Sequence, residues 1–357
     1  MPIDVHRSSL APPDKRAGAK TRGPASRRVL SIQLLLLLTC ASALPAAAAQ
    51  RASPAHADAY PSRPIRIVVP FPPGASPNDI TARLLGPKLS EQLHQQVVID
   101  NRPGAAGTIG TDIVAKSTPD GHTLLINSST LTIAPNAYKS LAFDPAKDLA
   151  PITMVAAAPQ LLMVSASLPV GSLKELIAYV KARPGQFKYS SGGNGTVPHL
   201  AGELLNQMAG LQMAHIPYKG GAPAAAALLG GEVSMFTDTP TGSLAMIKSG
   251  KVKVLAVASK VRTPLLPDVP TAEEAGLPGY DLRVWYGFFA PARTPRPIVK
   301  KLYDEFRIAL AAPDIQSRFT AMGTETVGMA PDDFTRVFHG DLQRWAKFVR
   351  ETGLQLH

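Results

Sequence analysis

The amino-acid sequence predicts an α/β fold in which parallel strands are covered by helices. From Tyr60 onward, short apolar segments typical of strands alternate with amphipathic segments typical of helices. The 357-residue chain is 45% hydrophobic and 18% charged, which is enough apolar material for a sizeable core and for two domains. Glycine- or serine-rich segments follow several of the strand segments, where open α/β sheets bind ligands.

Nine segments are expected to form strands, because each is a short run of strand-forming residues close to turn residues. In chain order these segments are residues 65–69, 97–100, 123–127, 160–164, 188–190, 212–215, 234–237, 253–258 and 283–290.

Helices are expected between these strands and after the last of them. Ser172 and Glu175 form a capping box at the start of an apolar stripe. Two C-terminal stripes repeat every three or four residues and predict core-facing helices, namely Ile298, Leu302, Phe306, Leu310 and Phe334, Phe338, Leu342, Trp345, Val349. Pro87 lies inside another helical pattern, and we expect its ring and missing N–H to kink or interrupt that helix.

The turn after the first strand has the composition of an anion site. Residues 70–79 read PFPPGASPND, so Ser76 is a candidate N-cap, Pro77 suits the first helical position and Asp79 falls in the first turn. Backbone N–H groups and the helix dipole would together stabilise a carboxylate near residues 74–77. The alternative is that proline and glycine only make a rigid turn. We expect Asp79 to cap the helix rather than to act as a catalytic acid.

The first 49 residues resemble a secretory signal. Seven basic residues precede an apolar run centred on residues 34–38, and four alanines at residues 46–49 offer a cleavage site, with cleavage near residue 59 as the alternative. Arg27 and Arg28 leave twin-arginine export as a second route, and lipid attachment at Cys40 is a competing interpretation. Because Cys40 is the single cysteine, the mature chain is expected to contain no disulfide.

Removal of this segment makes the charge balance moderate. It carries seven of the 37 basic and two of the 26 acidic residues, which leaves 30 and 24 and a net charge of +6. Such a surface can steer small anions. The remaining basic residues are scattered and do not interleave with aromatic residues, so we expect no nucleic-acid partner.

Four polar or glycine-rich loops after strands are the candidates for ligand contact. They are residues 101–107, 128–130, 191–196 and 218–221, and we expect several of them to face one cleft. Glycine lets backbone N–H groups approach a ligand, and hydroxyl groups such as those of Ser128 and Ser129 add donors.

The residues do not favour an enzyme or a metal site. Ser191, His199 and Asp238 have the types of a hydrolytic triad, but no G-x-S-x-G elbow surrounds the serine. His199 follows a proline and is better explained as a residue that caps a helix or lines a site. The histidines are widely spaced and the mature chain lacks cysteine, so we expect neither a metal nor another cofactor. A secreted hydrolase using Ser191 and His199 remains an alternative.

Several motifs together resemble the substrate-binding proteins of tripartite tricarboxylate transporters, also called Bug receptors. The motifs are PFPPGASPND with ITAR, NRPGAAGTIG, PDGHTLL, SSGGNGTVPHLAGELL, PYKGGAPA and WYGFFAPARTPRPIV. They occur in the family's order over essentially the whole mature chain. The resemblance implies a type II periplasmic binding protein-like fold, with two α/β lobes joined by two crossing strands. The crossings would lie near Ala157 and Arg283, so that residues 60–157 plus 284–357 form lobe 1 and residues 158–283 form lobe 2.

The resemblance also implies a binding site. The turn that contains Phe71, Pro73, Gly74, Ala75 and Ser76 matches the lobe 1 loop that holds a ligand carboxylate, although Ala75 replaces the family's usual second glycine. The second-lobe loop is matched by Ser191, Gly192, Gly193, Asn194 and Thr196, and Asp238 falls where a polar residue selects the distal end of the ligand. With Ser128, Ser129 and His199, these residues are the predicted site.

The function implied is that of a periplasmic receptor, expected to be a monomer, that closes on a small carboxylate and delivers it to a membrane permease. A receptor of the same fold that signals to a regulator is the alternative. The sequence leaves the identity of the ligand, the export route and the effect of Ala75 open.

Overall fold

The structure is a computed structural model that describes residues 60–74, 76–138 and 140–353, all within one compact unit. The signal sequence predicted over residues 1–49, the alternative lipid attachment at Cys40 and the contribution of Ala75 fall outside the described residues. No helix in the described part is long and apolar enough to cross a membrane.

The first part of the chain alternates strands and helices, as expected. Its elements are β1 (Ile65–Val69), α1 (Pro77–Leu93), β2 (Val97–Asn101), a short 3-10 turn (Ala105–Gly107), α2 (Thr108–Ala115), β3 (Thr123–Ser128), α3 (Thr130–Ala137), α4 (Pro145–Asp148) and the long strand β4 (Leu149–Ser165).

The second part continues this alternation and ends in helices. Its elements are α5 (Leu173–Lys181), β5 (Lys188–Ser191), α6 (Val197–Ala209), β6 (Ala214–Pro217), α7 (Gly221–Leu229), β7 (Met235–Asp238), α8 (Pro240–Lys248), β8 (Val252–Ala258), β9 (Arg283–Pro291), α9 (Arg296–Ala311), α10 (Pro313–Ala321), β10 (Glu325–Met329) and α11 (Pro331–Thr352).

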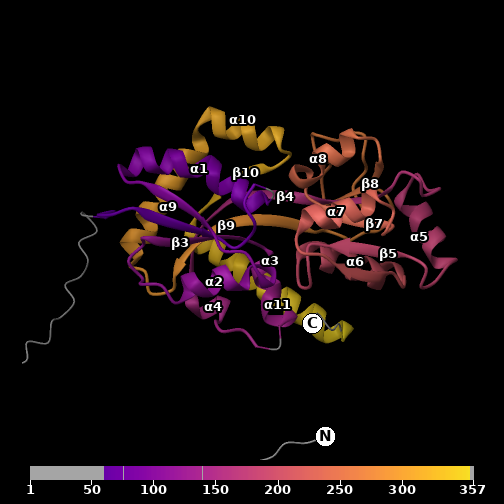
Figure 1. Ribbon diagram of the computed structural model, residues 1–357, viewed down its shortest axis with the longest axis horizontal. Coiled ribbons are helices and arrows are strands. Elements are labelled where there is room, and N and C mark those ends of the chain that lie inside the picture. Colours follow the sequence, from indigo (N-terminus) through magenta and orange to yellow (C-terminus); the bar gives the residue numbers. More distant parts are fainter. Residues whose placement is uncertain (1–59, 75, 139, 354–357) are drawn as a thin grey trace, which may run out of the picture. The chain divides into compact units, whose positions relative to one another are not determined.

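The strands form one sheet in the order β2-β1-β3-β9-β4-β7-β5-β6, and β8 and β10 also pair with β4 (Figure 1). β4 changes partners between Pro159, which pairs with β9, and Gln160, which pairs with β8. We call β1, β2, β3, β9 and β10 the first strand set, and β5, β6, β7 and β8 the second strand set. The positions expected for the lobe boundaries remain a prediction.

The sheet is mixed rather than purely parallel. β1 pairs in parallel with β2 and β3, and β5 pairs in parallel with β6 and β7. All pairings of β4, and that of β3 with β9, are antiparallel. This difference from the sequence prediction arises because β4 and β9 lie side by side in the middle of the sheet and run antiparallel to each other and to the strands beside them.

The predicted start of α1 is confirmed, but the predicted interruption is not. Ser76 accepts a hydrogen bond from the Asp79 N–H, and Pro77 occupies the first helical position. The helix runs through Pro87 to Leu93. The turns on either side of Pro87 bury Leu85 and Leu89 in the core, and this tertiary packing offsets the cost of a missing N–H.

Two other strand predictions need correction. The strand expected at residues 160–164 is the end of β4, which begins at Leu149, and β10 was not predicted at all. β4 is almost fully buried, so its apolar run lacks the alternation that marks a half-buried strand.

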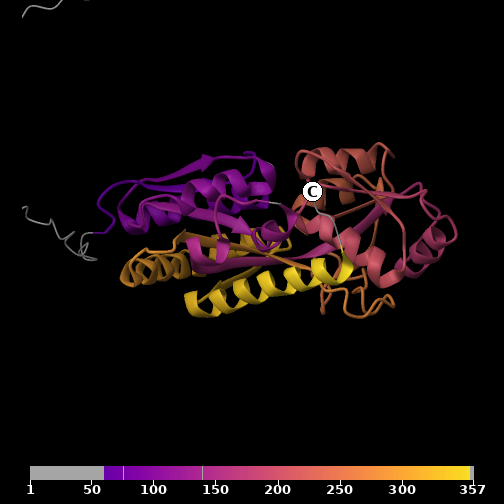
Figure 2. The ribbon, with the colours of Figure 1, turned by 90° about the horizontal axis from the view of Figure 1, so that it is seen from below.

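The core lies between the sheet and the helices on its faces. The C-terminal stripes are confirmed as buried, since Phe306, Phe334 and Phe338 are fully inaccessible. Figure 2 shows α11, in yellow, as a long helix along one side of the molecule. This helix packs against β4 and α3. The rigid helices and strands leave the loops at the strand ends to form the candidate site.

Candidate functional site

A cavity of about 320 Å³ is bounded by residues from both strand sets and from β4. Its wall includes six of the predicted site residues, namely Phe71, Ser76, Ser128, Gly192, Thr196 and Asp238. These residues lie at the ends of β1, β3, β5 and β7 or at the starts of the helices that follow. The cavity is therefore at the carboxyl ends of parallel strands, where α/β sheets bind ligands.

Five helices begin at the wall of this cavity. Asn78 of α1, Thr130 of α3, Val197 of α6, Gly221 of α7 and the Thr239 cap of α8 all contribute to its lining. The helices α3, α6, α7 and α8 have no side chain that caps their first turn from the N-cap position. Backbone N–H groups and four positive helix ends are thus directed at one region, which favours an anion there.

Asp79 holds the loop between β1 and α1 in place. Its fully buried carboxylate accepts hydrogen bonds from Gly74 N at 2.7 Å, Arg83 Nε at 2.8 Å and Asn101 Nδ2 at 2.8 Å. Burial opposes ionisation of Asp79, but the hydrogen bonds from Arg83, Asn101 and Gly74 outweigh it and lower the pKa. Asp79 therefore organises the loop as well as lying in the first turn of α1, while Ser76 makes the predicted side-chain cap.

The Gly74 N–H is occupied by this carboxylate, so it is not one of the free donors of the loop. Gly74 has φ +78°, a conformation that side chains rarely adopt. Asn101 also donates from Nδ2 to the Phe71 carbonyl at 3.0 Å. The network around Asp79 thus fixes the backbone on both sides of Pro72, which lines the cavity.

The glycine-rich loop after β5 packs closely on the start of α7. A Cβ atom at Gly192 would lie 3.1 Å from the Gly220 carbonyl carbon and 3.2 Å from the Gly221 nitrogen. Gly220 N also donates to the Gly192 carbonyl at 3.1 Å, and Thr196 Oγ1 donates to the Gly193 carbonyl at 2.8 Å. The two loops therefore form one continuous part of the cavity wall.

Two stacked histidines support this loop from behind. His199 is buried, accepts a hydrogen bond from Gly195 N at 3.1 Å and stacks on His215 with 3.7 Å between ring centroids. Burial lowers the pKa of His199 to about 3 and that of His215 to about 4, and the neighbouring His215 lowers the former further. Both rings are therefore neutral at pH 7.

Ser191 is tied to these histidines rather than arranged as a nucleophile. Its Oγ lies 2.6 Å from His215 Nε2, not from His199, and it bonds to the backbone of Gly193. Among the described residues, no carboxylate hydrogen-bonds to either imidazole ring. The Ser191, His199 and Asp238 combination considered from the sequence is not brought together as a triad.

The wall formed by β4 and β7 carries acceptor groups. Asp238 accepts a hydrogen bond from Thr239 N at 2.7 Å, and burial raises the pKa of Asp238 to about 6. Gln160 Oε1 and Asn78 Oδ1 are buried without a hydrogen-bond partner, and the Thr239 side chain hydrogen-bonds to Asp238 and Tyr286. Lys219 lines the same cavity.

The other predicted site residues lie behind this wall or beside it. They are Pro73, Gly74, Ser129, Ser191, Gly193, Asn194 and His199. Ser129 begins α3, and Ser191 and His199 support the glycine-rich loop.

Sequence reasoning missed several lining residues, including Gln160, Lys219, Pro223, Thr239 and Tyr286. Lys219 belongs to a loop that the sequence analysis marked but did not commit to the site. Gln160 had no local signal, because it lies within an apolar strand.

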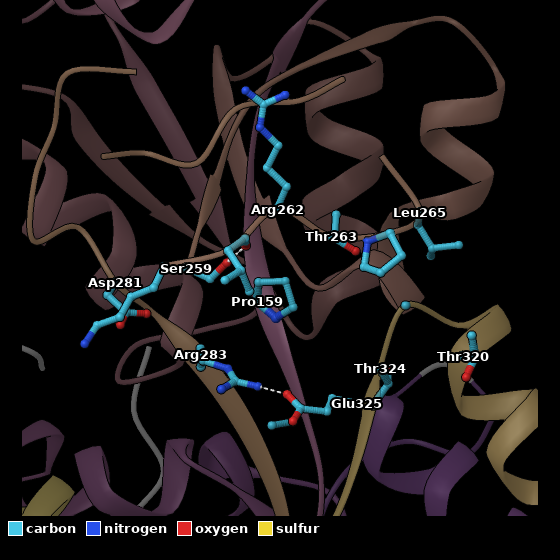
Figure 3. A pocket seen from close by; sticks show the side chains of 15 residues that line it. Pro159, Ser259, Arg262, Thr263, Leu265, Asp281, Arg283, Thr320, Thr324 and Glu325 are labelled. Atoms are coloured by element: carbon cyan, nitrogen blue, oxygen red, sulfur yellow. Dashed lines mark hydrogen bonds and ion pairs between the residues drawn. The ribbon is translucent and has the colours of Figure 1, made fainter. Parts of the chain in front are cut away.

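A larger cavity of about 670 Å³ contains none of the predicted site residues (Figure 3). It lies among β4, β9, the segment after β8 and the turn before β10. Arg283 pairs there with Glu325, and the Arg262 guanidinium points away from this pair and bonds to Glu274 (Figure 3). No described residue of its wall begins a helix. The smaller cavity is therefore the candidate site.

Comparison with protein families gives one match that covers most of the chain. The tripartite tricarboxylate transporter family receptor model, TctC, matches residues 81–354. Protein BugT of Bordetella pertussis (strain Tohama I) is 39% identical over 307 residues, which span 85% of this chain and 94% of BugT.

Solved structures show the same fold. The structure of the periplasmic binding protein BugD has a TM-score of 0.77 and 36% identity, and the match covers 83% of this chain and 99% of BugD. MatC from Rhodopseudomonas palustris with bound malate has a TM-score of 0.76 and 34% identity, over 81% and 100% of the two chains. The periplasmic binding protein fold expected from the sequence is confirmed.

Proposed function

The chain belongs to the tripartite tricarboxylate transporter receptor family, and from this premise we propose that it captures a small carboxylate in the 320 Å³ cavity and delivers it to a membrane permease. Members of this family are periplasmic receptors, so the chain is a solute-binding protein and not an enzyme. The predicted signal at residues 1–49 would direct its export.

The convergence of helix N-termini on the cavity is the observation that supports a carboxylate most strongly. An anion near one such terminus gains about 0.3 to 1 kcal/mol, so α3 and α6, whose starts do not face Asp238, contribute roughly 0.6 to 2 kcal/mol. A micromolar Kd needs about 8 kcal/mol. Direct hydrogen bonds and the burial of the solute therefore have to provide most of the binding free energy.

The malate bound by MatC supports a solute of this class, since MatC and this chain are similar over nearly the whole of MatC. In the proposed mechanism, residues 60–157 plus 284–357 and residues 158–283 act as two lobes connected through β4 and β9. A solute that contacts both lobes would favour the closed form through the additional contacts made there. The permease would then recognise the closed form.

A thermal-shift screen with acetate, succinate, malate, adipate, citrate, 4-hydroxybutyrate and 4-aminobutyrate tests the proposal. We expect at least one of these carboxylates to raise the Tm, because a ligand that binds the folded state alone stabilises it by RT ln(1 + [L]/Kd). At 100 times Kd this is about 2.7 kcal/mol. Mass spectrometry before and after incubation should show no turnover. If no carboxylate of the screen raised the Tm, the proposed function would be wrong.

Two matched glycine variants test the part played by the first loop. Gly74 and Gly185 have nearly the same φ, +78° and +74°, and at neither glycine would an added Cβ atom lie within 4 Å of a neighbouring atom. Gly74→Val and Gly185→Val should therefore lose similar stability, about 1 to 2 kcal/mol. Calorimetric titration should show at least a tenfold loss of carboxylate affinity for Gly74→Val alone. Equal affinity in both variants would remove the first loop from the site.

A further inference from the structure

Asp238 places an anionic group in a cavity that otherwise favours anions. It is the acidic residue among those that line the cavity. Within the described part of the chain, no lysine, arginine or histidine forms an ion pair with it. Its Oδ1 accepts a hydrogen bond from Thr239 N, and the Thr239 side chain also hydrogen-bonds to the carboxylate. A carboxylate without a cation beside it in a poorly solvated place is costly, so its presence needs an explanation.

The neighbouring helix is shaped around this carboxylate. Gly242 lies in the first half of α8, and a Cβ atom there would be 2.2 Å from Asp238 Oδ2. Gly221, at the start of α7, faces the same oxygen, with 3.9 Å to its Cβ position. Glycine inside a helix is unfavourable relative to alanine. The glycines thus leave space in which Oδ2 is reachable from the cavity.

A buried acceptor accompanies Asp238. Gln160 is 1% exposed, and its Oε1 has no hydrogen-bond partner. Gln160 and Asp238 both line the cavity. Buried polar atoms normally require partners, so the cavity offers a donor group two acceptors, the Asp238 carboxylate and Gln160 Oε1.

We propose that the solute carries an ammonium group at the end opposite its carboxylate, and that Asp238 accepts hydrogen bonds from this ammonium group. The inference rests on the proposed function, because it assumes that the helix N-termini bind the carboxylate end. The solute would then be an amino-carboxylate rather than a dicarboxylate.

The charge of Asp238 decides between the three possible kinds of distal group. A second carboxylate would face Asp238 as a like charge in a poorly solvated site. A hydroxyl group could donate one hydrogen bond but would leave the charge of Asp238 without a counter-ion. An ammonium group has three donors and the opposite charge, so it matches the Asp238 carboxylate and the Gln160 acceptor.

Isothermal titration calorimetry with three matched series tests this inference. The probes are unbranched dicarboxylates, ω-hydroxycarboxylates and ω-aminocarboxylates of three to six carbons, for example succinate, 4-hydroxybutyrate and 4-aminobutyrate. We expect the best ω-aminocarboxylate to bind at least about tenfold more tightly than the dicarboxylate and the hydroxycarboxylate of equal length. The free-energy difference that a tenfold ratio of Kd values represents is close to the contribution of one charge-assisted hydrogen bond.

Variants then assign the preference to Asp238. Asp238→Asn keeps the shape of the side chain and removes its charge, and it should reduce the preference for the amino group to less than threefold. Asp268→Asn is the matched control, because Asp268 is exposed and lines neither cavity.

Gly242→Ala should also weaken ω-aminocarboxylate binding, since its methyl group would displace Asp238 Oδ2. Thermal melts establish that each variant is folded. If a variant does not fold, the affinities of the wild-type protein for the three series of probes still test the inference.

The outcomes separate this inference from the proposed function. Tight binding of dicarboxylates or hydroxycarboxylates in preference to amino-carboxylates would overturn the inference and leave the carboxylate receptor intact. The same holds if Asp238→Asn keeps the wild-type preference. If no member of any series binds, both the inference and the proposed function are overturned.

Discussion

Two acidic residues at the site, the buried Asp79 and the partly buried Asp238, have opposite environments. Asp79 accepts three hydrogen bonds, including one from the Arg83 guanidinium, and its pKa is lowered. Asp238 has no such cation, and burial raises its pKa to about 6. The first arrangement stabilises a loop. The environment of Asp238 keeps an unfavourable charge at the place where a solute would bind. Acidic groups with a shifted pKa are typical of functional sites.

Asp238→Asn is expected to stabilise the ligand-free protein in a pH-dependent way. The native pKa of about 6 lies above the ordinary value of 3.8, so the folded state binds more protons between these pH values and loses stability as the pH rises. The penalty is absent below about pH 4 and amounts to roughly 3 kcal/mol above pH 7. Asparagine removes it.

Urea unfolding of wild type and Asp238→Asn at pH 4 and pH 7.5 checks this expectation. The free energy of unfolding of the variant should exceed that of wild type at pH 7.5, and the difference should shrink at pH 4. Asp268→Asn controls for the change in net charge. A variant that is less stable than wild type at pH 7.5 would contradict the argument.

At the scale of elements, glycines set how closely helices approach the sheet. Gly202 in α6 would place a Cβ atom 2.2 Å from Tyr189 Cε2 of β5. Tyr189 is fully buried, and its hydroxyl group hydrogen-bonds to Glu203 and to the His199 carbonyl. The ring therefore has little room to move. By contrast, Gly340 in α11 is exposed and has nothing within 4 Å of its Cβ position.

Alanine at these two helical glycines should have opposite effects on stability. Gly202→Ala gains up to about 1 kcal/mol of helix propensity but costs about 1 to 3 kcal/mol in overpacking, so we expect net destabilisation of about 1 to 2 kcal/mol. Gly340→Ala should stabilise by up to about 1 kcal/mol. Chemical denaturation of both variants checks the contrast, and stabilisation by Gly202→Ala would show that α6 can move away from β5.

At the scale of the whole molecule, β4 connects the two strand sets. Its first part pairs with β9 and β10, and its last part pairs with β7 and β8. Loss of either strand set would expose one part of this buried strand. The described residues also form a single compact unit. The two strand sets should therefore depend on each other for stability.

We expect the mature protein to unfold in one cooperative transition. Differential scanning calorimetry should give a calorimetric enthalpy equal to the van't Hoff enthalpy, because neither strand set keeps its core when β4 is released. A bound carboxylate should shift the whole transition upward without splitting it. Two resolved transitions would show that the strand sets are separate folding units.

The sequence was sufficient for elements that depend on local signals. The Ser76 cap, the Ser172 cap and the C-terminal apolar stripes were all predicted and are present, although Glu175 accepts from Gly171 N rather than from Ser172 N as in a full capping box. These features involve residues within one turn or one helical face, so spacing reveals them. The predictions failed for β10, for the start of β4 and for the interruption at Pro87, because long-range packing determines each of them.

The sequence by itself determined the α/β alternation, the family and the set of loops that carry the candidate site, since these follow from periodicity and local motifs. Only the tertiary structure decided which groups meet at the cavity. Gln160 reaches its wall at the point where β4 passes from pairing with β9 to pairing with β8, and Ser191 meets His215 because β5 and β6 are neighbours. Such contacts join residues that are distant in the chain, and no local pattern records them.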